Sequence, residues 1–187
     1  MNLLKASIGF SLASLFSVTV AQAHPIADPG TEGFSVTASG GEIFATYEGT
    51  TASYSNDLYL NGVFIFNNHS TPVGTTVSLG IFAANTELIF ELRVNNTGES
   101  YFTGPATRNP DGYAHARVQS DWSTPGTTLV SFEDLYNGPF EYNDLSFSFT
   151  NTIGTPLPPV PEPSTYALMV AGLALVGASR AFRSKKN

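Results

Sequence analysis

The amino-acid sequence predicts an all-β domain, a jelly-roll-like antiparallel β-sandwich, with a distinct segment at each end of the chain. Short stretches alternate between apolar and polar residues, and turn-forming clusters separate them at intervals of about 8–12 residues. Between residues 24 and 165, no stretch keeps a helical period of about 3.6 residues. The length of 187 residues indicates one globular domain. Because the chain has no cysteine, this domain is expected to fold without disulfides.

Nine strands follow from this alternation. The hairpin formed by residues 58–60 and 63–66 has the clearest signal, because Asn61-Gly62 suits both positive-φ positions of a type I′ turn. Asn109-Pro110-Asp111-Gly112 is likewise expected to be a turn. The expected strands are residues 33–38, 42–48, 58–60, 63–66, 75–82, 87–95, 113–119, 127–132 and 145–150.

The N-terminal residues 1–23 have the organisation of a secretory signal peptide. Lys5 gives a basic start, residues 6–20 are apolar apart from serine and threonine, and Ala21-Gln22-Ala23 is a small-x-small cleavage site. We expect signal peptidase to cut after Ala23; a retained membrane anchor is the alternative. The remaining chain then begins with a flexible leader at 24–32, followed by the β-sandwich domain at 33–151.

The C-terminal end is expected to be a stalk, a membrane span and a basic tail. Prolines crowd residues 152–165 and favour an extended polyproline conformation. Residues 166–182 are largely apolar, and as a helix they extend about 25 Å, slightly less than a hydrocarbon core. The positive-inside rule places the tail, residues 183–187, in the cytoplasm. The basic residues that determine this orientation are Arg180, Arg183, Lys185 and Lys186.

This C-terminal arrangement resembles the PEP-CTERM sorting signal of Gram-negative bacteria. The resemblance rests on Val160, Pro161, Glu162 and Pro163, followed by the apolar helix and the basic tail. It implies a precursor held in the inner membrane and processed near the motif by an exosortase, a membrane cysteine protease. It also implies a final location at the cell surface or in an exopolysaccharide or biofilm matrix. An ordinary anchor with a proline-rich stalk is the alternative.

The charge of the central segment separates it from both ends. Residues 24–161 contain 3 arginines, no lysine and 14 acidic residues, a net charge of −11. Nucleic-acid binding needs clustered lysines and arginines, so this composition argues against a nucleic-acid partner. An acidic, lysine-free domain instead attracts divalent cations.

The segment 133–144 concentrates oxygen ligands between two expected strands. If the loop folds back on itself, it brings Asp134 and Asp144 together, and Ca²⁺ prefers six to eight oxygens at about 2.3–2.6 Å. The calcium hypothesis has five protein ligands: Glu133, Asp134, Glu141, Asn143 and Asp144. The alternative is a metal-free turn in which Asp134 and Asn143 bond nearby backbone N–H groups.

The same segment resembles a pattern of bacterial surface domains, in which F-E-D-L and Y-N-D-L flank a glycine-containing turn. The matching residues are Phe132, Glu133, Asp134, Leu135, Tyr142, Asn143, Asp144 and Leu145. This resemblance implies a calcium-stabilised loop. The chain departs from the pattern at residues 137–140, which lack an aspartate, and at Glu141, which replaces one.

Aromatic residues supply a second functional hypothesis. Trp122 is the only tryptophan of the chain, and with Tyr113 it could form a platform that stacks on sugar rings. That arrangement would make the domain a carbohydrate-binding module. A tryptophan that fills the core of the sandwich is the structural alternative.

The sequence favours a protein that is not an enzyme. It contains no Gly-x-Ser-x-Gly, His-Glu-x-x-His or phosphate-binding loop motif. Glu133 and Glu141 could be posed as the two carboxylates of a glycosidase, but acidic residues that flank a turn are far more common. The sequence therefore predicts a secreted, exosortase-sorted matrix protein with a structural or adhesive role that Ca²⁺ assists.

Overall fold

The computed structural model describes residues 23–156 and residue 169. Within these residues, no helix is long and apolar enough to cross a bilayer. The expected signal peptide up to residue 22 and the stalk from residue 157 onward lie outside the described residues. The same is true of the expected span and tail, except for residue 169.

Twelve β-strands and one short 3₁₀ helix make up the regular structure of residues 23–156. The strands are β1 Ser35–Ala38, β2 Gly41–Thr50, β3 Asn56–Leu60, β4 Val63–Asn67, β5 Thr76–Phe82, β6 Glu87–Leu88, β7 Phe90–Val94, β8 Glu99–Phe102, β9 Ala116–Gln119, β10 Thr127–Phe132, β11 Leu145–Thr150 and β12 Thr152–Thr155. The helix is η1 Ala106–Arg108. All of the strand pairs are antiparallel, which confirms the predicted all-β class.

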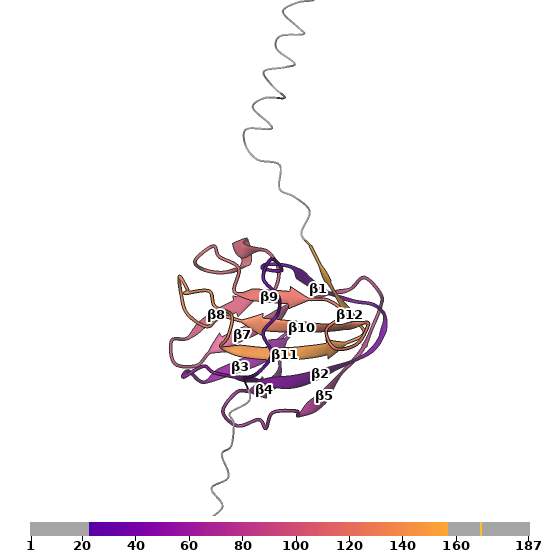
Figure 1. Cartoon of the computed structure of the whole chain (residues 1–187), viewed down its shortest axis with the longest axis horizontal. Helices are drawn as coiled ribbons and strands as arrows, with labels where there is room; N and C mark the ends of the chain where they lie inside the picture. Colours follow the sequence, from indigo (N-terminus) through magenta and orange to yellow (C-terminus); the bar gives the residue numbers. More distant parts are fainter. Residues whose placement is uncertain (1–22, 157–168, 170–187) are drawn as a thin grey trace, which may run out of the picture.

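The strands form three sheets, and the two larger ones share one apolar core. The sheet orders are β5-β2-β11-β10-β9, β4-β3-β7-β8 and β12-β1-β6. Figure 1 shows the two larger sheets as overlying layers. Phe90 of β7 stacks on Phe149 of β11 with 4.0 Å between ring centroids, and Phe66 of β4 stacks on Phe147 of β11 at 6.0 Å. These aromatic contacts hold the two layers together.

Several predicted strands agree closely with the structure. β10 and β11 have the predicted bounds, and β3 and β4 form the predicted hairpin. Asn61 and Gly62 have φ angles of 52° and 76°, as a type I′ turn requires. The predicted strand at 87–95 is divided at Ile89, so that β6 joins the small sheet while β7 joins the four-stranded sheet.

Two strands, β8 and β12, are not predicted by the sequence patterns. β8 has only four residues and follows the turn after β7, so its alternation is too short to recognise. β12 occupies residues 152–155, where the sequence predicts the start of a stalk, and Thr155 pairs with Ser35 of β1. This pairing across the whole domain extends the folded part four residues beyond the expected end at 151.

Residues 24–32, expected to be a flexible leader, lie against the outer face of the five-stranded sheet. In Figure 1 this indigo segment crosses in front of β9, β10 and β11. Ala27 is buried, and its backbone N–H donates to Ser131 Oγ at 2.8 Å. Glu32 forms a β-bridge with Arg117 of β9, and Arg117 Nε lies 2.7 Å from Glu32 Oε1. The leader therefore covers part of the sheet.

Candidate metal centre

The carboxylates of Glu133, Asp134 and Asp144 converge where β10 ends and β11 begins. Phe132 and Leu145 are paired across these strands, so the residues just beyond them face each other. One oxygen from each of the three carboxylates lies within 4.8 Å of the other two. The antiparallel pairing of β10 with β11 produces this convergence.

Backbone N–H groups orient two of the three carboxylates, those of Asp144 and Glu133. Asp144 Oδ2 accepts a hydrogen bond from the N–H of Asp134 at 2.9 Å. The two carboxylate oxygens of Glu133 accept the N–H groups of Leu135 and Glu141, each at 3.2 Å. The loop backbone therefore fixes these two acidic side chains.

The cluster is largely shielded from water. Glu133 is 1% exposed and Asp134 is 3% exposed, while Asp144 is partly buried. Burial raises the pKa of Glu133. Burial, together with the charge of Asp144, raises the pKa of Asp134 to about 6, and burial with the charge of Glu133 raises that of Asp144 to about 6. Among the described residues, no arginine pairs with these carboxylates, so the cluster favours binding a proton or a cation.

Asn56, a fully buried residue of β3, reaches the cluster from the other main sheet. Its Nδ2 donates a hydrogen bond to Asp134 Oδ2 at 2.7 Å. Its Oδ1 is buried and has no hydrogen-bond partner among the residues that the structure describes. Because an unpaired buried acceptor costs about 1–3 kcal/mol, this oxygen needs a donor or a cation.

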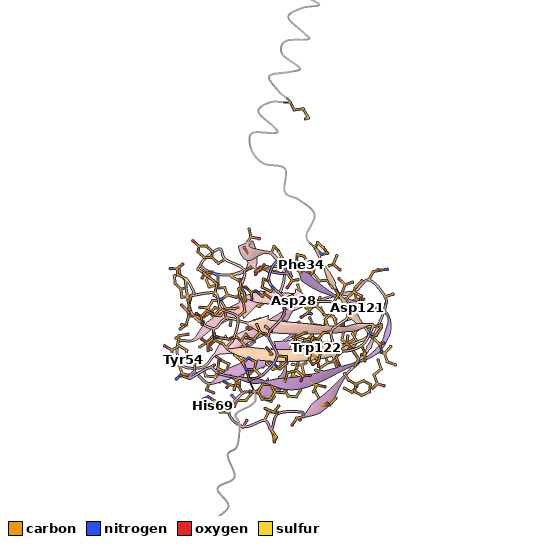
Figure 2. The ribbon with its side chains drawn as sticks, in the orientation of Figure 1. Asp28, Phe34, Tyr54, His69, Asp121 and Trp122 are labelled. Atoms are coloured by element: carbon orange, nitrogen blue, oxygen red, sulfur yellow. The ribbon has the colours of Figure 1, made fainter. Side chains whose placement is uncertain are left out.

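A surface hollow adjoins the cluster. Its walls are formed by Thr51, Ser53, Tyr54, Asp134, Leu135 and Asp144. The segment after β2 is bonded to the loop here, because the N–H groups of Thr51 and Ala52 both donate to the carbonyl oxygen of Asp144. Figure 2 shows Tyr54 at one side of the domain, where solvent or a ligand can approach the carboxylates.

A buried histidine–aspartate pair supports the loop backbone. His115 Nδ1 lies 2.9 Å from the carbonyl oxygen of Glu133, and Nε2 lies 2.8 Å from Asp111 Oδ2. The same Asp111 oxygen accepts the N–H of Asn137 at 2.9 Å. Burial raises the pKa of Asp111, but the N–H of Asn137 and the His115 ring outweigh that effect and leave the pKa below its ordinary value. The pair therefore ties a neighbouring turn to the acidic loop.

Two of the predicted ligands, Glu141 and Asn143, do not join the cluster. The side chain of Glu141 is exposed, and its Oε2 accepts a hydrogen bond from Asn143 Nδ2 at 3.1 Å. Phe140 and Tyr142, which flank Glu141, have left-handed φ angles of 59° and 56°. Side chains in this segment therefore do not alternate between two faces as they do in an extended strand. Although Glu141 is close to Asp144 in sequence, its carboxylate does not join the other three.

The two residues of the predicted aromatic platform, Trp122 and Tyr113, lie on either side of β9 in the chain. Trp122 follows β9 and is partly buried, whereas Tyr113 precedes β9 and lies with its ring 5.1 Å from that of Phe140. The two residues therefore stand at opposite ends of one strand. Figure 2 also shows Trp122 well away from Tyr54, which lines the hollow.

Three residues of the site lie outside the predicted ligand set: Asn56, Asp111 and His115. Asn56 is 78 residues from Asp134 in sequence, so only the packing of the two sheets brings them together. Asp111 belongs to the predicted turn Asn109-Pro110-Asp111-Gly112. Asp111 precedes His115 by four residues, and this short separation is the sequence feature that could have indicated their pairing.

The predicted sorting residues, Val160 to Pro163, lie outside the described residues, as do the basic residues of the tail. A family model described as the PEP-CTERM protein-sorting motif matches residues 159–186, which confirms the resemblance seen in the sequence. No curated protein and no solved structure gives a significant match to the chain. The motif implies processing by an exosortase and export to the cell surface.

Proposed function

We propose that this chain is a structural or adhesive component of an extracellular exopolysaccharide or biofilm matrix. The observation that carries the proposal is the PEP-CTERM motif at residues 159–186, which closely follows an all-β domain ending at residue 155. In this proposal, signal peptidase removes residues 1–23 and residues 166–182 hold the precursor in the inner membrane. Exosortase processing then delivers the domain to the outer surface or the matrix.

We also propose that the protein is not an enzyme. The arrangement of Glu133 and Glu141 supports this view, because Glu133 is 1% exposed and both its carboxylate oxygens accept backbone N–H groups. Glu141 is exposed and is bonded to Asn143. A general acid and a nucleophile must both reach a substrate, whereas the Glu133 carboxylate is buried and hydrogen-bonded within the loop.

A jelly-roll-like sandwich with a calcium-stabilised loop would suit a matrix component. A rigid antiparallel scaffold needs no disulfide, and the chain has no cysteine. The net charge of −11 over residues 24–161 attracts divalent cations, which can also bridge the domain to acidic glycans. Support for a cation role comes from the three carboxylates that converge within 4.8 Å.

The sorting proposal is tested by following the full chain in a Gram-negative host with and without an exosortase. The wild-type chain is expected to appear as a shortened species in the matrix fraction only when the exosortase is present. A chain with Pro161→Ala and Glu162→Ala should remain in the inner membrane at its precursor length. Glu141→Gln, an exposed change within the domain, serves as the matched control and should be sorted normally.

The structural or adhesive role is tested by the retention of polysaccharide on cells. Cells that lack the chain should retain less polysaccharide after washing, and the sorted wild-type chain should restore retention. Matrix delivery without the motif or the exosortase would overturn the sorting proposal. Normal retention in cells that lack the chain would overturn the structural role.

A further inference from the structure

We propose that Glu133, Asp134, Asp144 and the amide oxygen of Asn56 form a calcium site that ties the two main sheets of the domain together. The inference rests on the proposed function, which places the domain outside the cytoplasm. It deepens that function by naming the ligands of the cation, one of which, Asn56, belongs to the four-stranded sheet. It also assigns this ion a role inside the domain.

The spacing of the carboxylates fits a calcium ion. Ca²⁺ binds oxygen at about 2.3–2.6 Å, so two ligands on opposite sides of the ion are about 5 Å apart. One carboxylate oxygen from each of Glu133, Asp134 and Asp144 lies within 4.8 Å of the other two. All three can therefore contact one ion with little movement of the loop.

Asn56 supplies the second, independent observation. Its side chain is fully buried and its amide is directed at the cluster, since Nδ2 donates to Asp134 Oδ2 at 2.7 Å. Oδ1 belongs to the same small planar group and has no hydrogen-bond partner among the described residues. Amide oxygens are common calcium ligands, so a cation in the cluster would satisfy this buried acceptor.

The charge balance also favours a cation. Three carboxylates meet in a largely buried place, and the described arginines are paired elsewhere, with Glu32, Glu87 and Glu91. His115 is also engaged outside the cluster, since its Nε2 lies 2.8 Å from Asp111 Oδ2. A divalent ion would remove the repulsion among the carboxylates without the need for protonation.

The hollow beside the cluster explains how the ion enters and how its coordination is completed. Thr51, Ser53 and Tyr54 line this hollow together with Asp134 and Asp144. Four protein oxygens leave two to four positions for water, since Ca²⁺ takes about six to eight ligands. Mg²⁺ demands a tighter octahedron at about 2.0–2.1 Å, which a loop fixed by its own backbone bonds is less able to provide.

The ion would join the ends of strands from both layers. Asp134 follows β10, Asp144 precedes β11, and Asn56 begins β3. The hydrogen bond from Asn56 to Asp134 is already one link between the sheets at this end of the domain. Coordination of both residues by one ion would strengthen that link.

The test is a calorimetric titration of the full chain in detergent, stripped with a chelator and then titrated with CaCl₂. The wild-type chain is expected to bind one ion and to keep it in a tenfold excess of Mg²⁺. Asp134→Asn should weaken binding at least a hundredfold, and Asn56→Ala at least tenfold. Glu141→Gln is the matched control, since it removes a loop carboxylate outside the cluster, and its affinity should stay within twofold.

Asn56→Asp tests the ligand role even if Asn56→Ala fails to fold. It keeps an oxygen at this position and adds a charge, so it should bind calcium at least as tightly as the wild-type chain. Weaker binding by Asn56→Asp, unchanged binding by Asn56→Ala, or no binding by the wild-type chain would overturn the proposal. The sorting assay is independent: a chain that is sorted normally but binds no calcium refutes this site alone.

Discussion

His115 and Asp111 form a fully buried pair, with 2.8 Å between Nε2 of the ring and Oδ2 of the carboxylate. The other ring nitrogen, Nδ1, lies 2.9 Å from the carbonyl oxygen of Glu133. Both ring nitrogens are therefore engaged, one by the Asp111 carboxylate and the other by the backbone of the acidic loop. The pair thus fastens the base of the acidic loop to the turn that holds Asp111.

Replacing His115 by phenylalanine is expected to destabilise the domain by about 3 kcal/mol or more. The new ring can still stack on Tyr101, but the buried Asp111 carboxylate loses its contact with His115 Nε2. Urea unfolding measures the loss. His69→Phe is the control, because His69 is exposed, and it should change the free energy of unfolding by less than about 0.5 kcal/mol. Equal stability of the two variants would contradict a stabilising role of the buried His115–Asp111 pair.

Calcium is expected to raise the melting temperature of the full chain. An ion present at 100 times its dissociation constant adds about 2.7 kcal/mol, which corresponds to several degrees for a domain of this size. Asp134→Ala and Asp144→Ala should each abolish the rise, because each removes a carboxylate from the cluster. Scanning calorimetry with calcium and then with chelator makes the comparison. A calcium response that survives in both variants would place the ion elsewhere.

Without divalent ions, the domain is expected to be more stable near pH 5 than near pH 7.5. The pKa values of Asp134 and Asp144 are raised to about 6 in the folded state, above the value of about 4 in an unfolded chain. Their stabilising contribution is therefore complete below about pH 4 and is lost as the pH rises through about 6. Hydrogen bonds from Arg108 and Arg93 lower the pKa values of Glu87 and Glu91, whose contributions are lost only in more acidic solution.

Melting temperatures measured from pH 4.5 to 8 in chelator test this dependence. The double variant with Asp134→Asn and Asp144→Asn is the control, and its profile should be flatter over the same range. If the wild-type domain instead gains stability between pH 5 and pH 7.5, burial does not raise the pKa values of these two carboxylates.

Gly154 provides a test of the strand at residues 152–155. A Cβ atom at this position would lie 2.8 Å from the carbonyl oxygen of Val118, which is backbone and cannot easily move. Gly154→Ala should therefore cost about 1–3 kcal/mol. Ile153→Ala, at a neighbouring exposed position, should cost less when both are measured by urea unfolding. A harmless Gly154→Ala would indicate that this segment is a stalk, as the sequence suggested.

The local parts of the fold could be predicted from the sequence, because their signals are local. Alternation gave the bounds of β10 and β11, and Asn61-Gly62 gave the β3–β4 turn. β12 could not be predicted in this way, since its partner β1 lies at the other end of the domain. Short strands depend on such distant partners more than on their own residues.

The candidate site likewise combines residues that local sequence signals predict with residues that distant contacts bring in. The convergence of Glu133, Asp134 and Asp144 could be predicted from the sequence, because these residues flank the ends of two paired strands. Glu141 was included for its charge, but the left-handed residues on both sides of it place its carboxylate elsewhere. The contact between Asn56 and Asp134 could not be predicted, because only the packing of the two sheets brings these residues together.

The pairing of β1 with β12 also brings the two ends of the folded domain together. Ser35, near the start of the domain, pairs with Thr155, near its end. Contacts so distant in sequence raise the contact order of a fold, which slows its folding. Residue 155 precedes the matched sorting motif by only four positions. The small sheet therefore cannot be completed until almost the whole chain before the motif is available.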